Sequence, residues 1–383
     1  METPFIYGKV AVGENFTNRD KEKEKLRNNF LSGTNTILIS PRRWGKSSLV
    51  HKAASEARQK DSNLILVLID LFNIRSEEEF YKILAEQVIK ATSSKIEEVI
   101  ANVKNFMKQW VPKISFSPDS EQEFSLGLNW SDLKKQPDEI LDLAENIARS
   151  RKQRIVICLD EFQNIGFYKD SLAFQKKLRS HWQTHQSVSY CLYGSKRHML
   201  MEVFTSSSMP FYKFGDLMFL SKISIEYWVP FICERFKSTG KVIHEKLAEN
   251  IANLVGGHPY YVQQLAQQIW LRTEKEVSEH ILDDALESLV LQLSMLFQNL
   301  TENLTTPQVN FLRMLLNKEV QYSSKENIEK YRLGSSAHVV RIKKSLIRKE
   351  VIDEHMNELF ILDPLYSIWL DKYYFGPYIT PNQ

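Results

Sequence analysis

The sequence has few cysteines and no long apolar run. These two features argue against a disulfide-stabilised protein and against a membrane-spanning protein. Its 383 residues include three cysteines, an odd number, each in an apolar stretch: Cys158, Cys191 and Cys233. Such cysteines are typical of reduced core residues in a cytoplasmic protein, not of a disulfide framework. No apolar run approaches the roughly 20 residues that a membrane-spanning helix needs, and the first residues, METPFIYGKVAVGENF, lack the pattern of a secretory signal. We therefore expect a cytoplasmic protein with no membrane partner.

A strong charge of one sign is also missing. The net charge is +3, with 25% charged and 43% hydrophobic residues, as in ordinary globular proteins. This mild positive excess does not by itself indicate a nucleic-acid partner. The sequence has no fixed-period repeat and no low-complexity tract, and its length suits two or three domains.

Short apolar runs alternate with helical patterns over the first 224 residues. The runs are NTILIS, NLILVLID (63–70), RIVICLD (154–160), VSYCLYG (188–194) and DLMFLS (216–221). Runs that are apolar almost throughout are typical of strands buried on both faces of a parallel sheet. We predict an α/β core over residues 1–224, a parallel sheet with helices on both faces, and an inserted hairpin at about 105–136.

The stretch SPRRWGKSSL, residues 40–49, matches the phosphate-loop pattern G-x-x-x-x-G-K-[ST] except at its first position. Backbone N–H groups of such a loop bind phosphates, the lysine reaches the β- and γ-phosphates, and the hydroxyl ligates Mg²⁺. Serine in the first position costs little at negative φ and more at positive φ. We predict ATP or ADP and Mg²⁺ as ligands, with nucleotide contacts from Ser40, Pro41, Arg42, Arg43, Trp44, Gly45, Lys46, Ser47 and Ser48.

The stretch RIVICLDEFQNI places Asp160 and Glu161 at the end of a predicted strand. In phosphate-loop ATPases an acidic residue at this point helps to hold Mg²⁺, and an adjacent glutamate can act as the general base toward water. We therefore predict Asp160 and Ser47 as metal-binding residues, and Glu161 and Lys46 as catalytic residues.

Ser195 follows the predicted strand VSYCLYG. If that strand lies between the lysine-loop strand and the Asp160 strand, the hydroxyl can orient the attacking water, and we predict a catalytic role. The alternative is that Ser195 caps the next helix.

The arginines have several interpretations. Arg42 and Arg43 can contact phosphates, a neighbouring subunit or surface carboxylates. Arg179, in KKLRSHWQ, is a candidate arginine finger because guanidinium stabilises charge on a transferred phosphoryl group. The alternative for Arg179 is an ordinary solvent-facing helix residue.

The chain becomes mainly helical after residue 224. A helical lid domain is predicted over residues 225–304, and its last helical segment is ILDDALESLVLQLSMLFQNLTENL. In residues 305–383, three helical patterns precede two extended pieces around VIDEHMNELFILD. Three helices and a hairpin predict a winged helix-turn-helix domain.

The third helix of that domain, AHVVRIKKSLIRKE, carries positive charge. Arg341, Lys344 and Arg348 recur at helical spacing, as in a recognition helix. Against DNA binding, residues 305–383 hold 11 Lys and Arg beside 9 Asp and Glu, and VIDEHMNELF is acidic. We favour a switch or a protein contact, including self-association, over DNA binding.

The order of these features resembles a known group of proteins. PRRWGKSS, the LDE and YGS strand ends, the helical lid and the winged helix follow one another as in the AAA+-related STAND ATPases, which are P-loop NTPases. The chain is most similar to the prokaryotic and archaeal branch, whose loops often carry an Arg-Arg pair before the second glycine. The likeness covers nearly the whole chain, with Ser40 in place of the first glycine.

The resemblance implies contacts outside the loop. GGHPYYVQQLA (256–266) is similar to the family's lid motif, which implies that Pro259 packs on the adenine and His258 approaches the phosphates. From chemistry alone, GGHP is a helix stop and restart. YGKVAVGENFTNRDKE matches the segment that clasps adenine, with Val10 and Phe16 as contacts. In this family the winged helix often packs on the ATPase core as an intramolecular switch.

Together these features predict an ATP-binding, slowly hydrolysing regulatory ATPase that acts as a nucleotide-dependent conformational switch. One alternative is a nucleotide-dependent DNA-binding protein that resembles archaeal origin-recognition ATPases. A second alternative is a scaffold whose nucleotide is structural and is never hydrolysed. Ser40, in place of the first glycine of the loop, favours this alternative.

Overall fold

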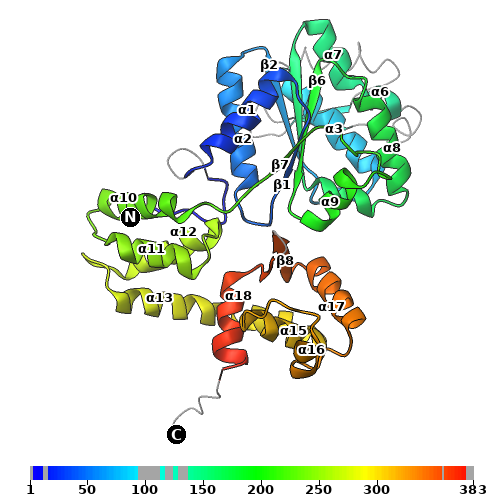
Figure 1. Cartoon of the computed structure of the whole chain (residues 1–383). Helices are drawn as coiled ribbons and strands as arrows, with labels where there is room; N and C mark the ends of the chain where they lie inside the picture. Colours follow the sequence, from blue (N-terminus) through cyan, green and yellow to red (C-terminus); the bar gives the residue numbers. More distant parts are fainter. Residues whose placement is uncertain are drawn as a thin grey trace. The chain divides into compact units, whose positions relative to one another are not determined.

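The computed structural model describes residues 3–11, 16–93, 113–116, 124–127, 137–355 and 358–376. The chain forms two compact units (Figure 1). One spans Arg19–Ser221, and the other combines Met1–Asn18 with Lys222–Gln383. Each unit is described by itself below.

The first unit is built on a five-stranded parallel sheet. Its strands are β1 (Thr36–Ile39), β2 (Leu64–Asp70), β5 (Arg154–Asp160), β6 (Val188–Gly194) and β7 (Asp216–Phe219). They lie in the order β2-β5-β6-β1-β7. The predicted strands are therefore confirmed, and β6 lies between the lysine-loop strand and the Asp160 strand.

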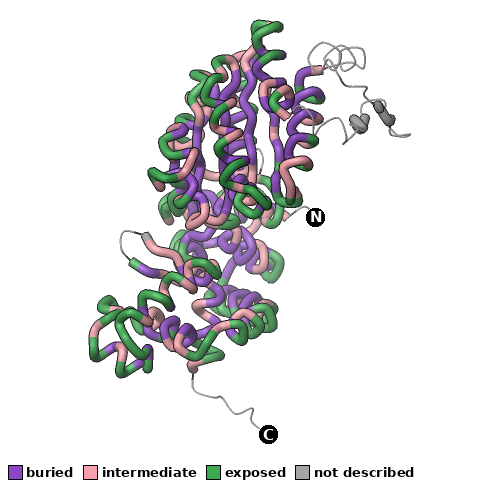
Figure 2. The backbone as a smooth tube through the Cα atoms, turned by 90° about the vertical axis from the view of Figure 1, so that its right-hand side faces the viewer, coloured by how far each residue is buried: buried purple, intermediate pink, exposed green. Residues whose placement is uncertain are grey.

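Helices cover both faces of this sheet. Figure 1 shows α1 (Asp20–Ser32) and α2 (Lys46–Lys60) on one face. The opposite face carries α3 (Glu77–Thr92), α6 (Pro137–Leu141), α7 (Leu143–Arg151) and α8 (Ser171–Trp182). Strands β1 and β5 are buried through most of their length, β6 is buried at every residue, and β2 and β7 are only partly buried (Figure 2). Burial on both faces explains why these strands read as continuous apolar runs.

Local chemistry sets the helix ends that frame the sheet. Helix α1 ends at Gly33, whose φ of 71° is left-handed and suits glycine. Helix α3 begins after Ser76, whose hydroxyl accepts a hydrogen bond from the backbone N–H of Glu79 at 3.2 Å. The 3₁₀ helix η2 (Phe162–Phe167) follows β5, and α9 (Arg197–Thr205) follows β6.

The predicted hairpin at 105–136 lies mostly outside the described residues. Within it the structure describes β3 (Lys113–Phe116) and β4 (Phe124–Gly127), which pair antiparallel.

The second unit contains a helical region. Its helices are α10 (Ile225–Ser238), α11 (Glu245–Leu254), α12 (Pro259–Arg272), α13 (Glu279–Gln292) and α14 (Ser294–Glu302). The predicted helical segment over 281–304 is helical, but it is divided into α13 and α14 because the chain breaks at Leu293. The break lets Phe297, 1% exposed, enter the core, and Ser294 Oγ accepts a hydrogen bond from Trp369 Nε1 at 3.1 Å.

A winged helix completes this unit. It comprises α15 (Thr306–Leu316), α16 (Lys325–Lys330), α17 (Ser336–Arg348) and the antiparallel strands β8 (Ile352–His355) and β9 (Glu358–Ile361). Helix α18 (Pro364–Trp369) and a π-helical turn (Leu370–Tyr374) follow. Thr301 and Tyr366 share a buried hydrogen bond of 2.8 Å between their hydroxyls, so the winged helix and the helical region share one core.

The N-terminal residues pack in this same unit. Phe5 is 1% exposed and contacts the rings of Phe231 and Phe236. The backbone N–H of Ile6 donates to Gln263 Oε1 at 3.0 Å. The division into three domains at residues 224 and 304 stays a prediction. In the described part of the chain, no helix has both the length and the hydropathy to cross a membrane.

Candidate functional site

The loop between β1 and α2 has a backbone that depends on Gly45. Gly45 has a φ of 85°, a left-handed conformation that favours glycine. Arg43 also has a positive φ, 63°. Ser40 is 1% exposed and is not among the positive-φ positions of the described chain. Serine therefore replaces the usual first glycine without left-handed strain.

Helix α2 starts directly after this loop, at Lys46. The residue that precedes the helix, Gly45, has no side chain with which to cap it. The first N–H groups of a helix have no partner within the helix, and together with the helix dipole they attract an anion. A loop followed by such a helix end is therefore suited to bind phosphate.

Lys46 and Ser47 meet the two carboxylates at the end of β5. Lys46 Nζ lies 3.0 Å from Glu161 Oε1 and 3.4 Å from Asp160 Oδ1. The Ser47 hydroxyl donates to Asp160 Oδ2 at 2.7 Å. All four predicted residues thus lie in one cluster, although 113 positions separate Ser47 from Asp160 in the sequence.

The second carboxylate oxygen of Glu161 receives its own set of donors. Ser195 Oγ donates to Glu161 Oε2 at 2.9 Å, and Gln163 Nε2 donates to the same oxygen. Ser195 reaches Glu161 because β6 is the neighbour of β5. Its hydroxyl bonds the glutamate, and helix α9 has no side-chain cap at its start.

Burial and neighbouring charge shift the pKa values of the two carboxylates in opposite directions. Burial raises the pKa of Asp160 above its ordinary value, although Lys46 and the Ser47 hydroxyl oppose the shift. Burial would also raise the pKa of Glu161, but Lys46 and hydrogen bonds from Gln163 and Ser195 outweigh it, so that pKa is lowered. Glu161 is therefore held ionised more firmly than Asp160.

Gln163 was not predicted from the sequence as a site residue. It is 1% exposed and lies against Gly194, where an added Cβ would approach Gln163 Oε1 within 1.9 Å. Gly194 therefore leaves the space that Gln163 needs to reach Glu161. The stretch DEFQNI holds the only sequence signal, an amide two residues after the glutamate.

Arg19 is a second residue that sequence reasoning missed. It is 4% exposed and has a φ of 99°. Its guanidinium donates to the Trp44 carbonyl of the loop at 3.3 Å, to the Ser221 carbonyl at 2.5 Å and to Glu22 at 3.2 Å. Burial lowers the pKa of Arg19, with Glu22 opposing. Because Arg19 is one of many charged residues near the start of the chain, the sequence does not indicate that it bonds the loop.

Other predicted residues lie apart from this cluster. Arg42 and Arg43 are exposed in the loop. Arg179 of α8 stacks over the Phe214 ring at 4.9 Å, which gives it a packing role in its own unit. Val10, 44% exposed, lies with Phe16, His258 and Pro259 in the second unit, and their contact with a nucleotide remains a prediction.

Comparison with solved structures finds proteins with the same fold. The Walker-type ATPase PABY2304 of Pyrococcus abyssi is 19% identical, with a TM-score of 0.65, over 96% of this chain and 99% of that one. The ORC2 protein of Aeropyrum pernix, solved as ADPNP-ADP complexes, is 14% identical, with a TM-score of 0.56, over 94% of both chains. The ORC1 protein of Aeropyrum pernix, solved in complex with DNA, is 12% identical, with a TM-score of 0.50, over 97% and 98%.

Comparison with protein families covers most of the sequence. No curated protein matches the chain. Residues 295–372 match a family described as a probable winged helix domain. Residues 16–265 match a family described as an ATPase domain predominantly from Archaea. That match spans more than half of the chain and agrees with the parallel sheet and its lysine loop, so this protein belongs to the family of ATPase domains found predominantly in Archaea.

Proposed function

We propose that this ATPase-family protein is a slowly hydrolysing regulatory ATPase that works as a nucleotide-dependent conformational switch. The observation that carries the proposal is the cluster of Lys46, Asp160 and Glu161 beside the uncapped start of α2. It combines an anion-binding helix end with a lysine ammonium and two carboxylates, which is the set of groups that phosphoryl transfer needs.

The residues present fit a nucleotide with Mg²⁺. Gly45, Lys46 and the first N–H groups of α2 would hold the phosphates, and the Ser47 hydroxyl and Asp160 would hold the metal. Bound Mg²⁺ supplies positive charge that stabilises the transferred phosphoryl group. No group of three or more His, Cys, Asp or Glu that could hold a metal occurs among the described residues. Mg²⁺ commonly uses one or two carboxylates together with substrate phosphates.

Glu161 is the proposed general base. Ser195 and Gln163 hold its Oε2 atom in place, and Lys46 holds Oε1. A base whose pKa is lowered accepts a proton less readily than one tuned near the working pH. The ion pair of Glu161 with Lys46, together with this lowered pKa, is our support for slow turnover.

Arg19 connects the lysine loop to the two points at which the chain enters and leaves the first unit. The first unit begins at Arg19 and ends at Ser221, so the chain leaves that unit at both residues. The Arg19 guanidinium joins the carbonyls of Trp44, in the loop, and Ser221. A loop that rearranges around a nucleotide would strain these bonds. A ligand shifts a conformational equilibrium only by its differential affinity for the two states.

Nucleotide titration and phosphate release on the same sample test the proposal. The wild-type protein should bind ATP and ADP with Mg²⁺ and release phosphate slowly. The Glu161→Gln variant should bind with similar affinity and release phosphate about 100-fold or more slowly, since it lacks the base. Unchanged release by the variant would remove Glu161 from this role. Binding without release by the wild type would favour the structural-nucleotide scaffold.

DNA binding is a second candidate, favoured by the exposed face of α17. Arg341, Lys344 and Arg348 are exposed on this helix. None of the three forms an ion pair or hydrogen bond with another described residue. Basic residues along one exposed helix face are typical of phosphate contacts.

Duplex binding at several salt concentrations tests this candidate. Binding should weaken steeply between about 50 and 200 mM salt, and neutralising Arg341 and Lys344 should lower the salt slope by about two. Lys343→Ala is the matched control, because Lys343 lies on the same helix but pairs with Glu354 at 2.7 Å. Salt-independent or undetectable duplex binding would argue against this function.

A further inference from the structure

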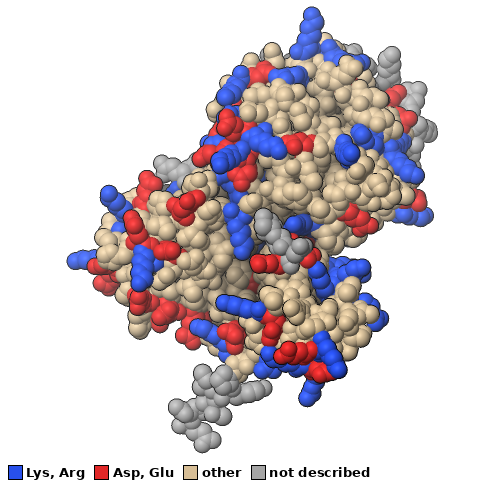
Figure 3. Space-filling model, in the orientation of Figure 1, with Lys and Arg blue, Asp and Glu red and all other residues tan. Residues whose placement is uncertain are grey.

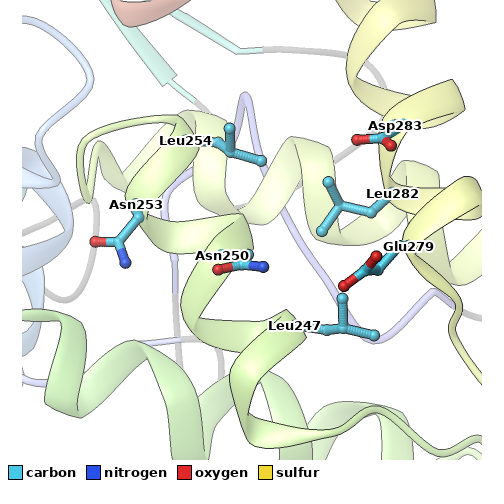
Figure 4. Close-up of a pocket in the computed structure, with 7 residues that line it drawn as sticks. All are labelled: Leu247, Asn250, Asn253, Leu254, Glu279, Leu282 and Asp283. Atoms are coloured by element: carbon cyan, nitrogen blue, oxygen red, sulfur yellow. The ribbon is translucent and has the colours of Figure 1, made fainter.

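A groove lies between α11 and α13 in the second unit (Figure 4). Its volume is about 480 Å³, within the range of sites that bind other molecules. The lining residues are Leu247, Asn250, Asn253 and Leu254 from α11, and Glu279, Leu282 and Asp283 from α13. Leu247 and Leu282 form a buried apolar floor, and Leu254 is 37% exposed.

The polar rim of this groove is unsatisfied within the described chain. Glu279 and Asp283 are exposed and form no ion pair or hydrogen bond with other described side chains. By contrast, Asp284 on the same helix binds His280 at 2.9 Å. Two unpaired carboxylates beside leucine side chains suit an apolar group flanked by cations.

The surroundings reinforce the negative charge. The segment from α11 to α14, residues 245–302, contains nine Asp and Glu and three Lys and Arg. Figure 3 shows acidic side chains along these helices and basic side chains around α17. A cationic partner would therefore be steered to the groove, and an anionic partner such as DNA would be repelled.

Helix α17 presents the complementary surface. Val340 is 48% exposed and lies at one edge of the exposed face of this helix. Arg341, Lys344 and Arg348 are exposed and lie together on one side of Val340 along the helix. Residues 336–348 contain four Lys and Arg and no Asp or Glu. This face carries one apolar group among cations, the inverse of the groove.

We propose that the groove between α11 and α13 of one molecule binds the α17 face of a second copy of this chain. Val340 would enter between the leucines, and Arg341 and Lys344 would pair with Glu279 and Asp283. The two faces differ, so the contact is heterologous, and its repetition builds a ring or an open chain of molecules. The contact requires no nucleotide turnover and therefore stands apart from the switch.

Charge-reversed pairs of full-length proteins test the contact by sedimentation. The groove variant combines Glu279→Lys with Asp283→Lys, and the helix variant combines Arg341→Glu with Lys344→Glu. The wild type should self-associate at low salt and dissociate as salt rises. Each variant alone should associate about tenfold or more weakly, because like charges face each other across the contact. Mixing the two variants should restore association, because opposite charges then meet at every interface.

Matched controls separate this contact from general charge effects. Asp284→Lys and Lys343→Ala alter charges on the same two helices but outside the complementary surfaces, and both should associate like the wild type. All these residues except Lys343 are exposed, so thermal unfolding midpoints should stay close to that of the wild type. Nucleotide affinity of the variants should also be unchanged, which keeps this test distinct from that of the switch.

Three results would overturn the proposal. A wild type that stays monomeric at about 100 μM in low salt excludes a useful self-contact. Association that survives in the groove variant places the interface elsewhere. A monomeric wild type that binds duplex DNA, with loss only in the helix variant, assigns α17 to nucleic acid.

Discussion

The two units of this protein use charge in opposite ways. In the first unit, Lys46, Asp160 and Glu161 are largely buried and bond one another. In the second, Glu279 and Asp283 on α13 and the arginines of α17 are exposed and have no partner among the described residues. Buried, paired charge is held in one geometry and is little affected by salt, whereas exposed charge acts on other molecules and is screened. This difference is why we assign the proposed chemistry to the first unit and the proposed self-association to the second.

Of the changes that test this comparison, removing Lys46 should have the largest effect, which we expect on nucleotide affinity. Lys46→Ala takes away the cation shared by both carboxylates and the group that reaches the phosphates. We expect ATP and ADP affinity to fall about 100-fold or more, a loss of about 3 kcal/mol. Isothermal titration measures this loss, with Lys52→Ala, a half-buried lysine of the same helix outside the cluster, as the control. Unchanged ATP and ADP affinity in Lys46→Ala would show that the nucleotide site is not at this loop.

Removing Arg19 should come next. Arg19→Met keeps the length of the side chain but leaves the buried carbonyl of Trp44 and that of Ser221 without this donor. Such losses cost about 1–3 kcal/mol each, so we expect a destabilisation of about 2–4 kcal/mol in denaturant unfolding. Lys21→Met, an exposed position of the same helix, should change stability by less than about 0.5 kcal/mol. Equal stability of the two variants would show that the hydrogen bonds of Arg19 do not stabilise the folded protein.

Adding a methyl group at Gly194 should have a smaller, more local effect. Gly194→Ala places a Cβ against Gln163, which must move and release Glu161. We expect phosphate release to fall about tenfold and stability to fall by about 1–3 kcal/mol. The double variant Gly194→Ala with Gln163→Ala should regain stability but not turnover. If Gln163→Ala fails to relieve the destabilisation, the clash lies elsewhere.

Acid should produce the smallest effect and should separate the two carboxylates. The pKa of Asp160 is raised, so this group gains its proton at a higher pH than an ordinary aspartate. The pKa of Glu161 is lowered, so this group stays ionised over the same range and gives up its stabilising contribution only at lower pH. Mg²⁺-dependent nucleotide affinity should therefore weaken as pH falls, because protonation removes the Asp160 ligand at a higher pH than for an ordinary aspartate. Titration at falling pH should show this loss in the wild type, whereas Asp160→Asn should keep only the dependence that comes from protonation of the nucleotide phosphates.

Part of the site could be predicted because its sequence signals are local. Gly45, Lys46 and Ser47 occupy consecutive positions that a phosphate loop requires, and Asp160 and Glu161 follow a strand with an apolar signature. The strand order then explains why Ser195 meets Glu161, an expectation that depended on the position of β6.

Other features could not be predicted because they depend on packing between distant segments. Arg19 acts through the carbonyls of Trp44 and Ser221, and any residue type offers a carbonyl. The helix break at Leu293 follows from the burial of Phe297 in a core shared with Tyr366 and Trp369. The periodicity over 281–304 contains no sign of either contact.

The sequence by itself determined the alternation of strands and helices, the phosphate loop and the acidic strand end, because these are set by local propensity and fixed spacing. Tertiary structure alone decided which donors hold Glu161, which carbonyls Arg19 joins, and that α11 and α13 leave an acidic groove with an apolar floor. The physical reason is that hydrogen bonds and grooves join atoms that are close in space, and the fold sets those distances independently of separation along the chain.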